Sequence, residues 1–299
     1  MKIHRTIQAN KQRPHLLIGN YDGVHCGHQN IILAAKRLAQ IDHAPIACLT
    51  FQPHPNIHFG KPHQAIQTPY DQWMTLSAYG IKDLYLLRFN GRLANMSYQE
   101  FIDQVLAPLN PKTIHVGEDF KFGYKRKGTI DHLKTRFDTR VVPLYQDGNQ
   151  IKYASTHIRT CLAQGDLDAA AKQLGRPFHI SGIVKPGQKL GRQLGYPTAN
   201  LHAASHPLAG IFYGTTILPD QRRIPSAISI GYRPYQPTAY GLLETHLLDF
   251  DEHLYGQRLH VIFHQKIRDQ IAFDNLPDLI QQMDQDTQCI RQLREINST

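Results

Sequence analysis

The chain has 299 residues, enough for about two domains that each bury a core of their own. Lysine and arginine number 33 and aspartate and glutamate 24, so the formal net charge is +9, which favours anionic partners such as nucleotides, RNA or an acidic membrane surface. The basic residues form no run of five or more, which argues against a dedicated nucleic-acid-binding tail.

Cysteine content and hydropathy set further limits. The four cysteines are few and scattered, so no disulfide framework is expected. No apolar stretch approaches the length that spans a membrane, and the N-terminus has no apolar core of a signal peptide. We expect a cytoplasmic protein with reduced thiols and no membrane partner. The sequence does not fix its oligomeric state.

The first part of the chain alternates short apolar segments with segments of helical period. This pattern is typical of a parallel sheet with crossover helices. The predicted strands are 16–19, 46–51, 84–89, 113–117 and 141–145. Helical spacing occurs at 98–106 and 156–164, and Ser155 is the expected N-cap of the second helix.

Beyond Arg176 the pattern changes. Strand-like segments punctuated by glycine and proline occupy 180–184, 210–218, 227–230, 242–250 and 259–263. No helical pattern separates them, and a helix is predicted only at 276–296. We expect a small antiparallel barrel with a terminal helix. The predicted domains are therefore residues 1–176 and 177–299.

The segment 19–28, Gly-Asn-Tyr-Asp-Gly-Val-His-Cys-Gly-His, predicts a strand end, a glycine turn and a helix start. His25 and His28 lie three residues apart, and Gly27 leaves bare backbone between them. A polyanion such as a nucleoside triphosphate could approach both rings and the free amides of the first helical turn. Two other interpretations stay open: a histidine pair satisfied by backbone, or part of a zinc site. No nearby Cys-x-x-Cys supplies the usual zinc-ligand spacing.

Two later segments of the first domain carry further candidates. Segment 115–128 combines a strand end, carboxylates, aromatic residues, glycines and a basic cluster. Its Asp119 could belong to a binding site, or it could be a loop carboxylate that caps backbone amides. Segment 154–159, Ala-Ser-Thr-His-Ile-Arg, opens a helix, where hydroxyls, free amides and Arg159 would collect phosphate charge.

The second domain offers a metal pattern and a carboxylate. Segment 182–201 is rich in glycine and basic residues and ends with Thr198 and Asn200, which alternation places on one side of an extended chain. Their oxygen atoms suit a Mg²⁺ that keeps several waters, although a barrel-entry loop would also use such residues. Glu244 shares a strand face with His246 and could accept the proton of an attacking hydroxyl, or pair with an arginine at the surface.

These motifs, in this order, resemble those of bacterial bifunctional riboflavin kinases/FAD synthetases. Segments 19–28 and 154–159 resemble two nucleotidyltransferase signatures, and 115–123 resembles the family's Val-Gly-x-Asp-Phe-x-Phe-Gly loop. Segment 182–201 resembles the flavokinase signature, and 242–250 its glutamate-containing strand. The resemblance implies a Rossmann-like nucleotidyltransferase domain followed by a riboflavin-kinase barrel. It also implies that riboflavin and ATP give FMN, and that FMN and ATP give FAD, both with a divalent metal such as Mg²⁺.

The resemblance implies a role for each matching residue. The implied catalytic residues are Glu244, His25, His28 and Arg159, and the implied metal ligands are Thr198 and Asn200. The nucleotide-binding residues are Gly19, Asp22, Gly23, Gly27, Ser155, Thr156, Gly187, Gly191 and Arg192. The flavin-binding residues are Asp119, Phe120 and Arg268.

The sequence departs from the family pattern at four positions. Ala154 and His157 stand where the family usually has serine and arginine, and Ser229 and Tyr235 lie where it has asparagine and threonine. One alternative function is therefore a monofunctional FAD synthetase whose barrel only binds flavin or supports the fold. A more distant alternative, suggested only by charge, is a flavin-responsive RNA-binding regulator, which would retain RNA in a salt-dependent manner without turning over ATP.

Overall fold

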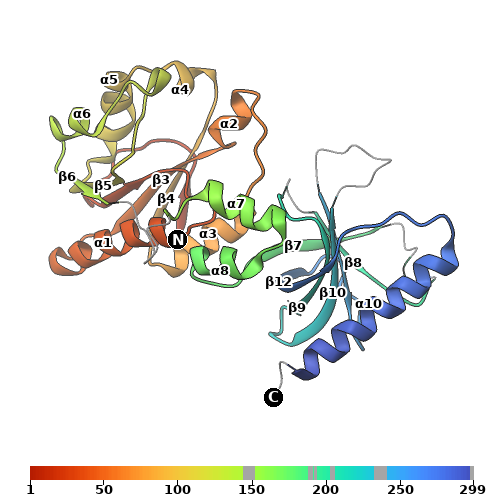
Figure 1. The fold of residues 1–299 in the computed structure, drawn as a ribbon. Helices are drawn as coiled ribbons and strands as arrows, with labels where there is room; N and C mark the ends of the chain where they lie inside the picture. The colour runs from red at the N-terminus through yellow and green to blue at the C-terminus, as the bar shows by residue number, and fades with distance from the viewer. Residues whose placement is uncertain (144–151, 188–190, 192–193, 203–205, 232–240, 297–299) are drawn as a thin grey trace. The chain divides into compact units, whose positions relative to one another are not determined.

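The structure is a computed structural model that describes residues 1–143, 152–187, 191, 194–202, 206–231 and 241–296 (Figure 1). The chain divides into two compact units. The first comprises Met1–His63 and Gln72–Ala154, and the second comprises Gln64–Asp71 and Ser155–Thr299. Helix α3 (Pro69–Ala78) therefore begins in the second unit and ends in the first.

The first unit is built on a parallel sheet of six strands in the order β1-β4-β3-β2-β5-β6, which confirms the predicted parallel sheet. The central strand β2 is buried along its whole length. Leu16 and Ile18 pack into the core on one face of the sheet, and Leu17 packs into the core on the other face. The strands are β1 (Lys2–His4), β2 (His15–Ile18), β3 (Ile46–Gln52), β4 (Asp83–Arg88), β5 (Thr113–Gly117) and β6 (Thr139–Val142).

Helices cover both faces of this sheet. Helix α1 (Cys26–Asp42) buries Ile32, Ala35 and Ala39 at helical spacing in the core that also holds Leu17. The opposite core receives the π-helix η1 (Ile102–Leu106), which continues α5 (Tyr98–Phe101). The other helical segments are α2 (Pro55–His58), α4 (Gly91–Asn95), η2 (Ala107–Leu109), η3 (Tyr124–Arg126) and α6 (Ile130–Lys134).

The second unit is an antiparallel barrel, as the sequence predicts, and it is closed with the strand order β10-β11-β8-β7-β12-β9. Alternate residues fill its interior; on β11, Leu243, Thr245 and Leu247 are buried, whereas Glu244 and His246 are half-buried. The strands are β7 (His179–Lys185), β8 (Ala199–His202), β9 (Gly210–Ile217), β10 (Arg223–Gly231), β11 (Leu242–Leu247) and β12 (Arg258–Arg268). Among the described residues, this unit has the helices α7 (Ser155–Gln164), α8 (Leu167–Leu174) and α10 (Leu276–Ile296), and α10 packs against β10.

Several element boundaries differ from the sequence predictions. The predicted helix 98–106 changes from α- to π-helix after Phe101. The predicted strand 242–250 ends at Leu247, because Asp249 adopts a left-handed φ of 56° that a strand does not allow. Ser155 is the first residue of α7 instead of its cap, a shift of one position. The predicted strand 141–145 begins earlier and ends at Val142, and positions 144 and 145 lie outside the described residues.

The compact units divide elsewhere than the predicted domain boundary after residue 176. Helices α7 and α8 belong to the barrel unit, because Ile158, Leu162 and Leu174 share one core with Phe178 and the barrel strands. Segment 64–71 joins the same unit and contributes Ile66 to that core. Independent folding of residues 1–176 stays a prediction, and such a fragment would leave this apolar surface without its barrel partners.

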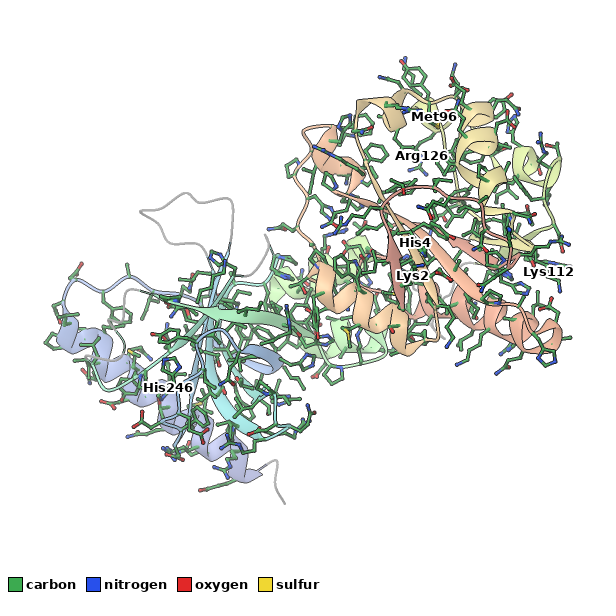
Figure 2. All side chains as sticks on the ribbon, turned by 180° about the vertical axis from the view of Figure 1, so that it is seen from behind. Lys2, His4, Met96, Lys112, Arg126 and His246 are labelled. Carbon is green, nitrogen blue, oxygen red and sulfur yellow. The ribbon has the colours of Figure 1, made fainter. Side chains whose placement is uncertain are left out.

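A partly buried polar network lies at the amino ends of β2 and β5, at the opposite end of the strands from the glycine turn. His15 Nδ1 lies 2.8 Å from Thr113 Oγ1 and 3.3 Å from His115 Nε2, and its Nε2 contacts Asp42 Oδ1 at 3.0 Å. Asp42 also pairs with Lys112, labelled in Figure 2, at 2.7 Å. The contacts with Lys112 and His15 lower the pKa of Asp42 to about 2. The pKa of His115 is lowered to about 4, mainly by burial and also by the neighbouring His15.

This network makes the stability of the first unit depend on pH. Between pH 4 and the ordinary histidine pKa near 6.5, the unfolded chain binds a proton at His115 that the folded chain does not, so stability falls as pH falls. Protonation of His115 should cost the wild type about 2 kcal/mol in the free energy of unfolding between about pH 7.5 and about pH 5. We expect His115→Gln to lack this part of the loss. Urea unfolding followed by fluorescence of Trp73, the single tryptophan, measures this difference. Substitution of exposed His58 is the control, and an unchanged pH dependence in His115→Gln would contradict the assignment.

Candidate functional sites

The first site lies where the chain changes direction across the parallel sheet. Strand β2 pairs with β3 on one side and with β5 on the other. In open α/β sheets, ligands bind at the carboxyl ends of strands at such a switch point. The segment that leaves β2 there forms a tight turn in which Tyr21, Gly23 and Val24 have positive φ, and the Val24 amide donates to the Tyr21 carbonyl at 3.1 Å.

The structure brings the two predicted histidines together at the start of α1. His25 immediately precedes the helix, and its ring stacks on that of His28 with centroids 3.7 Å apart. Burial lowers the pKa of His28 well below its usual value, and the neighbouring His25 lowers it further. The His28 imidazole is therefore uncharged near neutral pH and adds a ring nitrogen to the amide groups of the first helical turn. This arrangement can receive an anionic group.

The close approach of backbone and ring at this helix explains Gly27. A Cβ atom at Gly27 would lie 3.0 Å from the His25 ring and 3.5 Å from the Tyr153 carbonyl oxygen. Gly19 is similarly constrained, because a Cβ there would lie 3.2 Å from the Tyr21 ring. Both predicted glycines therefore let the turn fold closely around the histidine pair.

Residues that the sequence analysis did not select hold the carbonyl groups of the turn. Gln72, on α3, donates to the carbonyls of Asn20 at 2.7 Å and Tyr21 at 3.0 Å. Thr50, on β3, donates to Asn20 at 3.2 Å. The position of Thr50 on a strand neighbouring β2 was a usable signal, whereas nothing local in the sequence connects Gln72 with the turn.

Asp22, predicted to bind nucleotide, is buried beside His63, which stacks on a further histidine. His63 Nε2 lies 3.6 Å from Asp22 Oδ2, and the His63 ring stacks on that of His54 at 3.8 Å. The sequence analysis did not select His54 and His63 as site residues. The segment that follows β3 could have suggested His54, because it leaves the sheet at the same edge as the glycine turn.

The loop after β5 carries the predicted flavin residues Asp119 and Phe120. The Phe120 amide donates to the Gly117 carbonyl at 3.1 Å, which closes a turn, and the Phe120 ring stacks on Phe122 with centroids 5.7 Å apart. Asp119 is exposed and pairs with Lys152 at 3.6 Å. The structure thus fixes the turn and leaves the Asp119 carboxylate at the surface.

The residues of segment 154–159 that were predicted to bind phosphate belong mainly to the other compact unit. Ser155 and Thr156 open α7, and Arg159 Nε donates to the Gln64 carbonyl at 2.7 Å. His157, which replaces the family's usual arginine, lies 2.7 Å from Gln173 Nε2 on α8. The approach of Arg159 to the histidine pair stays a prediction.

The second site lies on the barrel, where three neighbouring strands carry polar residues directly opposite one another. Asn200 on β8 is opposite Glu244 on β11, which is opposite Ser229 on β10. Directly opposed residues in an antiparallel pair project from the same face, so this row is shared across the three strands. His246, labelled in Figure 2, lies two positions from Glu244, and its Nδ1 is 2.9 Å from the Pro197 carbonyl oxygen.

A pocket adjoins this row. It encloses about 80 Å³, and its lining includes Gly187, Thr198 and Asn200 together with the segment 250–255. Asn200 packs against bare backbone, because a Cβ atom at Gly187 would lie 2.8 Å from its Oδ1. A Cβ atom at Gly191 would lie 3.6 Å from Thr198 Oγ1. The predicted metal ligands and the two predicted nucleotide-binding glycines therefore lie together, whereas Arg192 and Tyr235 lie outside the described residues.

Arg268, predicted to lie near flavin, is bonded to the terminal helix. Its Nε and one terminal nitrogen donate to Asp286 on α10 at 2.9 and 2.7 Å. Asp286 is buried and also accepts from Gln282 at 3.0 Å. In this structure Arg268 therefore fastens α10 to β12.

The parallel sheet with its histidine turn, and the closed barrel with its polar row, together define a two-part transferase of the nucleotidyltransferase and flavokinase classes. Residues 7–157 match the family model described as FAD synthetase, and residues 174–294 match the one described as riboflavin kinase. The chain belongs to the family of bifunctional riboflavin kinase/FMN adenylyltransferases, which confirms the resemblance seen in its sequence.

Individual relatives match nearly the whole chain. A bifunctional riboflavin kinase/FMN adenylyltransferase from Pseudomonas fluorescens is 37% identical over 289 residues, which cover 92% of this chain and 91% of the relative. The protein of the same name from Bacillus subtilis is 32% identical and covers 95% and 94% of the two chains. A crystal structure described as a macrolide-efflux protein from Streptococcus pneumoniae superposes with a TM-score of 0.81 at 28% identity, covering 97% of this chain and 99% of the other. Among the described residues of the present chain, none of the helices is long and apolar enough to cross a membrane.

The packing at Gly27 leads to a test of the first site. We expect Gly27→Ala to weaken ATP binding about tenfold, equivalent to about 1.4 kcal/mol, because the new methyl group must displace the His25 ring. Isothermal titration with ATP measures the change. Gly91→Ala is the control, since a Cβ there meets nothing within 4 Å. Equal affinities in the two variants would contradict the proposed role of the bare backbone.

Proposed function

We propose that this chain phosphorylates riboflavin to FMN and adenylylates FMN to FAD, with ATP as co-substrate in both reactions. The observation that carries the proposal is the pair of family matches in series, one over each half of the chain. The grouping of Thr198, Asn200 and Glu244 around one part of the barrel supports two active reactions over a monofunctional synthetase. We assign adenylylation to residues 1–176, phosphorylation to residues 177–299, and the protein to the cytoplasm.

Adenylyl transfer requires charge stabilisation more than a base. A phosphate oxygen of FMN attacks the α-phosphorus of ATP, and the bond to the departing pyrophosphate breaks. The nucleophile is already an anion, so no proton has to be removed. His25, His28 and the first amides of α1 would bind the phosphates, with Arg159 adding positive charge, and Gly19, Gly23 and Gly27 would allow the close approach of the backbone.

Phosphorylation of riboflavin requires removal of a proton. The terminal ribityl hydroxyl attacks the γ-phosphorus, the bond to ADP breaks, and Glu244 would accept the hydroxyl proton. Glu244 lies directly opposite Asn200, which lines the pocket, and this position supports its proposed role as the base. Gly187, Gly191 and Arg192 would face the nucleotide.

The residues at the pocket fit a magnesium ion. Thr198 supplies a hydroxyl oxygen and Asn200 an amide oxygen, which are the hard ligands that Mg²⁺ prefers. The amide nitrogen of Asn200 donates to the Thr198 carbonyl at 3.4 Å, which orients its Oδ1 for a ligand. Bound Mg²⁺ would neutralise charge on the ATP phosphates.

Ser229 is a position at which the barrel domain departs from the family pattern, with serine in place of asparagine. It lies directly opposite Glu244, and its Oγ accepts from Gln270 Nε2 at 3.4 Å. The shorter side chain leaves the base and the metal ligands in place, so we expect altered flavin affinity with retained phosphoryl transfer. Asp119 and Phe120 would bind flavin in the adenylylating half.

One assay tests the whole proposal. The purified chain is incubated with riboflavin, ATP and Mg²⁺, and the flavins are separated by chromatography. Formation of FMN followed by FAD supports the proposal. Formation of FAD from supplied FMN, without FMN from riboflavin, would establish the monofunctional alternative, and salt-dependent RNA retention without ATP turnover would favour the regulator.

The histidine pair should serve only one of the reactions. We expect His28→Ala to reduce FAD formation from FMN by about 10²- to 10³-fold, the usual cost of losing a preorganised donor. FMN formation from riboflavin should persist, because Glu244 and the pocket belong to the barrel unit. Equal loss of both activities in a folded variant would refute the assignment to two sites.

The reciprocal variant tests the barrel site. Glu244→Ala should reduce FMN formation from riboflavin by about 10²- to 10⁴-fold, the contribution of a positioned general base. Adenylylation of supplied FMN should stay at the wild-type rate, so each variant is the matched control for the other. A Glu244→Ala enzyme with wild-type kinase activity would exclude Glu244 as the base.

A further inference from the structure

A cluster of metal-ligand types lies in the barrel unit and includes none of the residues assigned above. Asp71, in the first turn of α3, lies beside His179 on β7 and His260 on β12. One ligand atom from each residue lies within 4.8 Å of the other two. Asp71 is buried and the two histidines are half-buried, so the cluster is shielded from bulk water.

The hydrogen bonds of His179 determine which nitrogen faces Asp71. Its Nδ1 lies 3.3 Å from the carbonyl oxygen of Pro177, which can only accept, so Nδ1 carries a proton. Its Nε2 lies 3.8 Å from Asp71 Oδ1, beyond hydrogen-bond distance. In a neutral imidazole that is protonated on Nδ1, the lone pair is on Nε2. A ring nitrogen of His179 and a carboxylate oxygen of Asp71 thus face one small space.

The surrounding contacts match those of ligands already oriented for a metal. Asp71 Oδ2 accepts from the Thr68 hydroxyl at 2.7 Å and from the Ser181 amide at 2.9 Å. The Ser181 hydroxyl lies 2.8 Å from His260 Nδ1. Metal-bound histidines typically donate their second ring nitrogen to a carbonyl or another polar group, as His179 does here.

We propose that Asp71, His179 and His260 bind a divalent transition-metal ion of the zinc class. Two nitrogens and one carboxylate oxygen form a donor set that suits Zn²⁺ and similar ions, whereas Mg²⁺ prefers oxygen alone. Zinc bonds to nitrogen and oxygen are about 2.0–2.2 Å long, so one ion can bridge the 3.8 Å between Asp71 and His179. Side-chain movements of about 1 Å would bring the third ligand to bonding distance.

The position of the three ligands defines what the ion would do. His179 and His260 come from neighbouring antiparallel strands of the barrel, and Asp71 comes from the segment that joins this unit from far earlier in the chain. The ion would fasten this segment to the barrel. Because it binds the folded chain, it would raise the unfolding temperature without taking part in either transfer reaction.

The test uses the full chain stripped of metal with a chelator and titrated with Zn²⁺. Asp71→Asn keeps the size of the side chain and removes its charge, and His260→Gln removes an imidazole. His264→Gln is the matched control, because His264 lies exposed on the same strand and contacts Thr215 at 2.8 Å. Equilibrium dialysis measures stoichiometry, the visible absorption of Co²⁺ reports ligand geometry, and circular dichroism checks the fold.

We expect the wild type and His264→Gln to bind one more Zn²⁺ than Asp71→Asn and His260→Gln, and only the former pair to gain thermal stability from zinc. Ser181→Ala, which leaves all three ligands in place, should weaken zinc binding by about 10- to 100-fold. Equal stoichiometry in the wild type and Asp71→Asn would overturn the proposal and leave a hydrogen-bonded cluster only. Should a ligand variant not fold, unchanged zinc affinity in Ser181→Ala would have the same consequence.

Discussion

The first site depends on the complete burial of one short strand. Strand β2 has sheet neighbours on both sides and apolar cores on both faces, so its backbone is fixed in every direction. The turn that follows can therefore adopt positive φ at three of its residues, and α1 begins at a defined point. The position of this strand determines the position of the stacked histidines. The packing of the strand offsets the free-energy cost of the strained turn.

In the barrel, the closed sheet fixes the positions of the site residues. A closed sheet leaves each strand a fixed inner and outer face, so the buried Leu243, Thr245 and Leu247 determine where Glu244 projects. The opposed Asn200 and Ser229 follow from the register of the two neighbouring strands. A slip of one residue in β11 would bury the carboxylate and expose the leucines, so the core protects the site geometry.

Local patterns in the sequence were sufficient for the main architecture and for the glycine turn. Strand β2 contains the continuous apolar run 16–18, and α10 has the predicted bounds Leu276–Ile296 because its pattern is long and uninterrupted. Strand β1 has only three residues, none of them buried, so no local pattern could reveal it. Three-dimensional contacts such as Gln72 with the turn carbonyls join residues about fifty positions apart. The bond of Arg268 to Asp286 likewise depends on how α10 packs, which its own sequence does not specify.

The discontinuous second unit has a consequence for the order in which the newly made chain can fold. All six strands of the parallel sheet leave the ribosome before β7, so the first unit can assemble early. Asp71 and Ser181 are 110 residues apart, which corresponds to about 5 to 20 s of synthesis at typical rates. During that interval segment 64–71 must wait with its apolar Ile66 exposed, tethered between strands that have already paired. The segment between β3 and β4 thus keeps an apolar side chain without its core until the barrel has been made.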